Sequence, residues 1–269
     1  MIKKTTLQLL LILLFPIIGF SQPTQFVILD GTNNEYIKIP DSDSINKTTL
    51  NNRTVEFWFR VDNASIVTKQ MLYKERAIVR GVNIWIENDS LKLGMFSTNK
   101  DWYGTWFRHK IESNTWYHVA LVLDNVGTSG LKFYLNGASV SSGKGGKLFT
   151  NEGDVYVGGS KSNNKSLFPK INTTWTNDKF EAIDDTKTEA LTITYFDFKG
   201  AIGYFRIWNS ARTQTEIDDN KDIKLTILND STERMVAYLD GNRVKYVTNT
   251  GSSAYTNPGG IRVQSNCCS

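Results

Sequence analysis

The chain has 269 residues, of which 40% are hydrophobic and 12% aromatic, which suits one large β-domain or two small domains with a packed core. The formal net charge is +4, and it falls to +2 if Lys3 and Lys4 are removed with the N-terminal segment, leaving 29 basic against 27 acidic residues. This balance gives no electrostatic footprint for DNA or RNA and no polybasic patch for a membrane surface, so we expect no nucleic-acid partner.

The N-terminus has the pattern of a secretory signal. A short positive stretch precedes an almost wholly apolar run at residues 7–20, and the small residue Ser21 follows it. The run is too short for a membrane span, and no other segment approaches the ~20 apolar residues that a spanning helix needs. We therefore predict that residues 1–21 are a signal peptide, that the mature protein begins at Gln22, and that it is secreted or displayed at the cell surface.

Strand patterns dominate the rest of the chain. In the first of them, Val55, Phe57 and Phe59 alternate with Glu56 and Trp58, so one face is apolar. Turn signals such as Asn-Gly and Asp-Gly separate the runs, as in a β-sandwich or jelly-roll. The clearest strand runs cover residues 54–61, 116–123, 131–136, 202–208 and 235–239.

Two segments lack this regularity. Residues 160–198 form a long polar and irregular stretch, which in a compact domain is usually functional or poorly ordered. Residues 248–269 have a low apolar content, so we predict one domain over 22–247 followed by a loose tail. The tail holds both cysteines, Cys267 and Cys268, which are adjacent and cannot form a disulfide framework. An unstructured end and an intermolecular bridge both remain open for them.

Several stretches, in order, resemble the laminin-G-like jelly-roll domain of the concanavalin A-like lectin/glucanase superfamily, as found in secreted bacterial-type proteins. The resemblance spans roughly residues 26–240, and it implies an all-β fold, an antiparallel two-sheet β-sandwich. It says much less about function, because this fold hosts lectins, glycanases, adhesion modules and spacers. The stretches are Leu29–Gly31 with Tyr36–Pro40, Thr54–Phe59 (TVEFWF), Thr115–Val122 (TWYHVALV), Leu131–Gly137 (LKFYLNG), Val155–Gly159, and Phe198–Asn209 followed by Thr215–Ile217 and Val236–Tyr238.

Catalytic patterns are missing from the sequence. The glycanase branch of the superfamily carries two Glu and an Asp on one strand, and the chain has no such run: Glu87 begins one, but Lys92 stands where the second Glu is needed. Four further acidic residues lie in the irregular stretch and are either a solvated loop or an atypical carboxylate pair: Glu181, Asp184, Asp185 and Glu189. His109 and His118 are too few for a zinc site of several histidines.

The resemblance also implies a structural calcium ion that joins the opening turn to an aspartate in the last long strand. Gly203 stands where that aspartate is expected, so the carboxylate is lost. Asp30 and Asn33 in the opening turn could still supply oxygen ligands. We therefore expect no cofactor, with calcium at these two residues as the open alternative.

An aromatic loop is the candidate ligand surface. Trp102, Tyr103 and Trp106 fall within five positions, and Gly104 interrupts them, which disfavours a strand that packs all three inward. Flat aromatic faces suit the C–H faces of sugars, and Trp175 in the irregular stretch is a further candidate for the same surface. The competing interpretation is that one or two of these rings plug the end of the sandwich.

The sequence therefore favours a secreted or cell-surface recognition module without catalytic activity, whose partner is a glycan or an extracellular protein. One alternative is a glycoside hydrolase or lyase with an atypical carboxylate pair. Another is a structural or adhesion spacer without a small ligand.

Overall fold

The computed structural model describes most of the chain beyond the predicted signal peptide. Residues 1–21, Asn33, Trp175, Cys267 and Cys268 lie outside the described residues, so the predictions for them stay predictions. None of the described helical segments has the length and hydropathy needed to span a bilayer. The described residues are 22–32, 35–75, 80–97, 102–159, 166–169, 178–181, 188–191, 196–226, 228, 235–241, 243–256 and 262–265.

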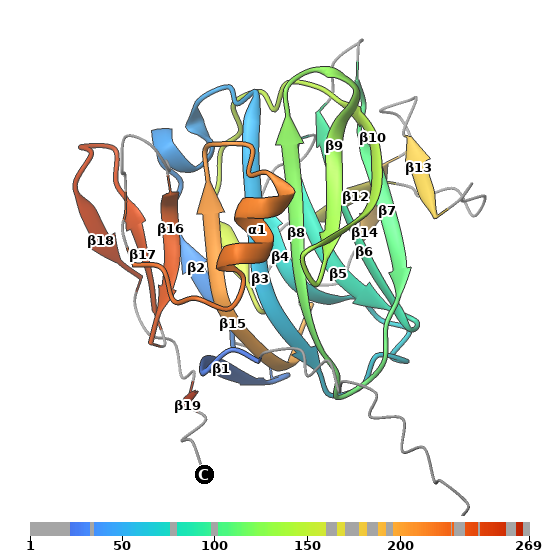
Figure 1. The fold of residues 1–269 in the computed structure, drawn as a ribbon, viewed down its shortest axis with the longest axis vertical. Helices are drawn as coiled ribbons and strands as arrows, with labels where there is room; N and C mark the ends of the chain where they lie inside the picture. Colours follow the sequence, from blue (N-terminus) through green and yellow to red (C-terminus); the bar gives the residue numbers. More distant parts are fainter. Residues whose placement is uncertain are drawn as a thin grey trace, which may run out of the picture.

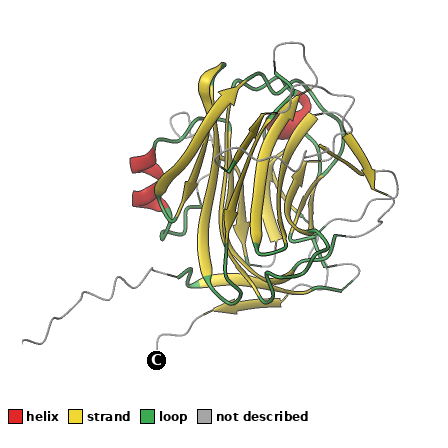
Figure 2. Ribbon diagram, turned by 90° about the vertical axis from the view of Figure 1, so that its right-hand side faces the viewer, coloured by secondary structure: helices red, strands yellow, loops and turns green. Residues whose placement is uncertain are grey.

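Two antiparallel sheets form a β-sandwich, which confirms the predicted fold class (Figures 1 and 2). Sheet A, as described, has ten strands. Its main path runs β10 (Ala138–Gly145), β9 (Gly127–Leu135), β8 (Trp116–Asp124), β3 (Asn52–Val61), β15 (Lys199–Trp208), β16 (Met235–Asp240), β17 (Arg243–Val247) and β18 (Ser253–Tyr255), and β1 (Gln25–Asp30) joins β15 to β19 (Arg262–Ser265).

Sheet B has seven strands in the described part of the chain, and a separate small sheet pairs β12 (Ser166–Pro169) with β14 (Thr188–Leu191). The order of sheet B is β13 (Lys179–Glu181), β7 (Thr105–Lys110), β6 (Ser90–Ser97), β5 (Arg80–Glu87), β4 (Gln70–Glu75), β11 (Val155–Val157) and β2 (Ile37–Ile39). The helical elements among the described residues are a short π-helix, Asp43–Lys47, and α1 (Gln214–Asn220).

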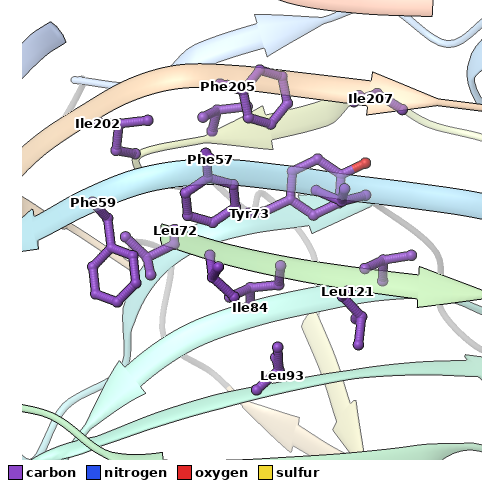
Figure 3. Close-up of a cluster of buried hydrophobic side chains, with 14 of the residues drawn as sticks. Phe57, Phe59, Leu72, Tyr73, Ile84, Leu93, Leu121, Ile202, Phe205 and Ile207 are labelled. Carbon is purple, nitrogen blue, oxygen red and sulfur yellow. The ribbon is translucent and has the colours of Figure 1, made fainter. Parts of the chain in front are cut away.

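The inner faces of the two sheets enclose the core. Phe57 and Phe59 of β3 point inward as the alternation predicts, and both are fully buried. Figure 3 shows them with inward side chains of both sheets, among them Leu72, Tyr73 and Phe205. The ring of Phe205 lies 6.1 Å from that of Phe57 and 5.8 Å from that of Tyr73. Aromatic contact across the sandwich therefore joins the sheets.

The outer face of sheet A carries α1 (Figure 1). Thr213 and Glu216 form a capping box at its N-terminus. Beneath it, the Glu56 carboxylate accepts hydrogen bonds from Arg206 Nη1 at 3.2 Å and Trp208 Nε1 at 2.8 Å. Arg206 also donates to backbone carbonyls at and beyond the helix C-terminus, 3.0 Å from Asn220 O. A buried ion pair therefore attaches the helix to the sheet.

Within the tail predicted over 248–269, two short segments form strands. Ser253–Tyr255 pairs with β17, and Arg262–Ser265 pairs with β1, so the C-terminal part of the described chain closes the edge beside the first strand. Backbone hydrogen bonds make these pairings, and they need no apolar side-chain pattern. The irregular stretch 160–198 likewise holds the three short strands β12, β13 and β14.

His118 gives the fold a testable pH dependence. It is fully buried beside Glu56, with its Nε2 3.6 Å from Glu56 Oε2. Burial lowers the pKa of His118 well below its usual range, and the charges of Arg206 and Lys221 lower it further. Below about pH 6.5 the unfolded chain therefore gains a proton that the folded chain does not, and the free energy of unfolding falls by about 1.4 kcal/mol per pH unit.

We expect His118→Gln to remove most of this slope in urea titrations between pH 7 and pH 5. His109→Gln is the matched control, because the pKa of His109 is lowered less strongly: partial burial lowers it while Asp178 raises it. If the free energy of unfolding depends equally on pH in His118→Gln and in the unsubstituted protein, His118 is not buried in its neutral form as described.

Candidate functional site

The face of sheet B that is turned away from the core, here called the outer face, gathers aromatic, amide and charged side chains. Along β5, Val82, Ile84 and Ile86 belong to the core, so alternation directs Asn83 and Trp85 to the outer face. The cross-strand register continues this face over the neighbouring strands. Its described members on β4 to β7 and β11 include Met71, Lys74, Asn83, Trp85, Glu87, Lys92, Gly94, Phe96, Trp106, Arg108 and Tyr156.

An aromatic cluster occupies the middle of the outer face. The ring of Trp106 lies 5.6 Å from that of Trp85, edge to face, and 5.7 Å from that of Phe96. Gly94 stands opposite Trp106 in the register, and a Cβ there would collide with the indole. The missing side chain at Gly94 therefore lets the indole lie across β6. Phe196, which precedes β15, packs on the same cluster.

Charged side chains border this cluster. Glu87 accepts hydrogen bonds from Lys92 Nζ at 2.6 Å, Lys69 Nζ at 3.2 Å and Trp85 Nε1 at 3.3 Å. Burial raises the pKa of Glu87, but the Lys92 hydrogen bond and the two lysine charges outweigh it, so the pKa lies below its ordinary value. Glu87 is therefore ionised at neutral pH and is unsuited to act as a proton donor.

The structure separates the residues of the predicted aromatic loop. Trp106 belongs to the outer-face cluster, whereas Trp102 packs in the main core, with its Nε1 donating to Thr105 Oγ1 at 3.1 Å. Both rings are buried, and Tyr103 between them is half-buried. These three residues do not form one exposed aromatic surface. Trp102 instead packs within the sandwich, which was the alternative interpretation of the aromatic loop.

The opening turn, the predicted calcium position, contains the carboxylate of Asp30, while Asn33 lies outside the described residues. Asp30 Oδ1 accepts a hydrogen bond from Thr32 N at 2.8 Å. Gly203 pairs with Phe26 inside the sheet, where a Cβ would lie 2.7 Å from Pro23, so a side chain there would not fit.

The sequence reasoning missed Asp197, a carboxylate near Asp30. Burial raises the pKa of Asp197, and the nearby charge of Asp30 raises it further. Among the described residues, no three acidic, histidine or cysteine side chains are grouped to hold a metal ion.

Asn83 and Lys74 are outer-face residues that the sequence reasoning also missed. Lys74 is 3% exposed and Asn83 fully buried, and the two are partners in the β4–β5 register. The available signal was the alternation of Val82, Ile84 and Ile86 with Asn83 and Trp85, which predicts a strand with two different faces.

Comparisons with known proteins agree with this architecture. A family model, Laminin_G_3, described as the concanavalin A-like lectin/glucanases superfamily, matches residues 30–172. A proposed carbohydrate-binding protein from Bacteroides ovatus is 16% identical with a TM-score of 0.55; the match covers 90% of this chain and 60% of that protein's length.

Two further solved structures are similar at lower TM-scores. The heptameric SAP-like pentraxin of Limulus polyphemus is 14% identical, with a TM-score of 0.47 over 90% of this chain and 95% of the pentraxin. Domains LG4-5 of the mouse laminin alpha1 chain are 12% identical, with a TM-score of 0.46 over 72% of this chain and 44% of that one. A search of curated proteins finds no match.

The different burial of the aromatic-loop residues predicts different costs of truncation. Trp106→Ala removes a fully buried indole and is expected to lower the free energy of unfolding by about 3–5 kcal/mol. Tyr103→Ala removes a half-buried ring and should cost at most about 1 kcal/mol. Urea unfolding of both variants measures this difference, and equal stabilities would show that Trp106 is not packed as described.

We predict little effect of calcium on stability. A ligand at 100 times its dissociation constant stabilises the folded state by about 2.7 kcal/mol, which calorimetry detects readily. We expect no such rise in Tm in millimolar Ca²⁺, whereas Asp197→Asn should raise Tm at pH 7 because it relieves the repulsion from Asp30. A Tm that rises with Ca²⁺, falls with chelator and loses this response in Asp197→Asn would contradict the prediction that calcium does not stabilise the protein.

Proposed function

The chain belongs to the Laminin_G_3 family of the concanavalin A-like lectin/glucanases superfamily, and from that membership we propose that it is a secreted, non-catalytic module that binds carbohydrate through the outer face of sheet B. The laminin-G-like fold supports a binding module. The signal-like N-terminus supports secretion, and the Bacteroides ovatus neighbour supports carbohydrate as the ligand class.

The observation that carries the proposal is the combination of side chains on the outer face. Lys92 and Arg108 supply cations and Glu87 supplies a carboxylate on adjacent strands, all three partly exposed, and the buried aromatic cluster holds these strands together. Sites for sugars use a few placed polar groups that fix the orientation of the ligand. A strand scaffold positions these groups more rigidly than a loop does.

The same face argues against glycoside hydrolysis. That reaction requires two carboxyl groups on either side of the scissile bond, one of them protonated. On the described parts of β4 to β7, Glu87 is the one carboxylate directed to the outer face, and its two lysine partners keep it ionised. We therefore propose binding without turnover.

A binding and turnover screen tests this function. The protein is expected to be retarded in native gels that contain at least one of β-glucan, galactan or alginate, and to release no reducing ends from any of them. Lys92→Ala should weaken the retardation several-fold, because Lys92 borders the aromatic cluster and holds Glu87 at 2.6 Å.

Lys132→Ala is the matched control for this screen. Its ion pair with Asp124 has the same 2.6 Å length but lies on sheet A. Reducing-end release, absence of any retardation, or equal weakening by the two lysine variants would count against the proposal.

A further inference from the structure

The outer face of sheet B is open to solvent at one end, and the side chains there are cationic. Along β7, Phe107 belongs to the core, so Trp106, Arg108 and Lys110 share the outer face. Trp106 is fully buried, the Arg108 side chain is 39% exposed and Lys110 is exposed. On β6, the Lys92 side chain is 20% exposed. A ligand that approaches this face therefore meets Lys92, Arg108 and Lys110, here called the cationic end.

Two of these cations stand directly opposite each other, since Lys92 of β6 and Arg108 of β7 are partners in the register. Like charges in this position are destabilising, because the Cβ atoms of opposite residues are only about 4.5–5.5 Å apart. Elsewhere in the described strand pairings, charged residues that stand opposite each other have opposite signs. These pairs are Asp30 with Lys199, Glu56 with Arg206, and Asp240 with Arg243. The cationic end is therefore an exception to the charge pattern of this fold.

Two carboxylates neutralise part of this charge in the free protein. Glu87 Oε2 lies 2.6 Å from Lys92 Nζ, and Glu87 is shared with a second lysine. Asp178 Oδ1 lies 2.8 Å from Arg108 Nε. Lys110 has no acidic partner among the residues that the structure describes. Four cations therefore stand against two carboxylates in this group, which leaves an excess of two positive charges.

We infer that the cationic end binds the anionic group of an acidic polysaccharide, a carboxylate or a sulfate carried on the sugar ring. One guanidinium and two ammonium groups on adjacent strands offer several donors to a single anion. Hydrogen bonds between ionised partners are about twice as strong as those between neutral ones, so an acidic sugar gains more here than a neutral one. This inference rests on the proposed function of the outer face and names the class of glycan that it binds.

Matched polysaccharides test the recognition of charge. We expect alginate, whose sugars carry carboxylates, to bind at least about tenfold more tightly than alginate whose carboxyl groups have been reduced to alcohols. Sulfated and unsulfated galactan form the second matched pair, so the two pairs show whether carboxylate, sulfate or both are recognised. Calorimetric affinity for the acidic polymer should also fall steeply as NaCl rises from about 0.05 to about 0.5 M, because salt screens exposed charges.

Two substitutions with opposite expected effects test the residues. Lys110→Gln should weaken binding of the acidic polysaccharide about threefold, whereas Lys132→Gln, which removes the same charge from sheet A, should not weaken it. Asp178→Asn should strengthen binding, because it removes the carboxylate that competes with the ligand for Arg108. Asp178 has φ +56°, a conformation that asparagine adopts readily, so this substitution preserves the turn. An ion pair with a purely structural role predicts no gain in affinity.

The outcomes separate this inference from the proposed function. If the unsubstituted protein binds no polysaccharide, acidic or neutral, the proposed function fails and the inference fails with it. If it binds β-glucan or a neutral polymer of either matched pair as tightly as the acidic ones, the proposed function stands and the inference alone fails. The inference is likewise overturned if Asp178→Asn does not strengthen binding, or if Lys110→Gln and Lys132→Gln bind equally well.

Discussion

The mutual burial of the two inner sheet faces is the interaction on which the rest of the structure depends. Phe57 and Phe59 of β3, Tyr73 of β4 and Phe205 of β15 fill the space between the sheets, and none of them is exposed (Figure 3). Interiors packed in this way leave no room for a sugar-sized ligand between the sheets. Any recognition surface must therefore lie on an outer face or at the rim, where the strand scaffold still fixes the side chains.

The two outer faces carry polar groups of different exposure. On sheet A, the Glu56 carboxylate is fully buried and pairs with Arg206 and Trp208, so these polar groups serve stability. On sheet B, Glu87, Lys92 and Arg108 stay partly exposed on the outer face. Polar groups that remain in contact with solvent can meet a ligand, and this contrast is the physical basis for assigning recognition to sheet B.

The sequence predicts the sandwich well because strand alternation is a local signal: Phe57 and Phe59 point inward as their spacing requires. It predicts the site poorly because the decisive facts are not local. Which face Trp106 joins depends on the register with Gly94, and the full burial of Trp106 and Asn83 depends on the whole tertiary environment. The pairing of β19 with β1 escaped for a similar reason, since backbone contacts between chain ends leave little trace in side-chain patterns.

Hydrogen–deuterium exchange with and without the bound polysaccharide tests the location of the recognition surface most directly. The account predicts slower exchange of backbone amides in β5, β6 and β7, whose partly exposed outer side chains include Glu87, Lys92 and Arg108, and unchanged exchange in β15 to β18 of sheet A. Protection confined to sheet A, or to the opening turn at Asp30, would contradict the assignment of recognition to the outer face of sheet B.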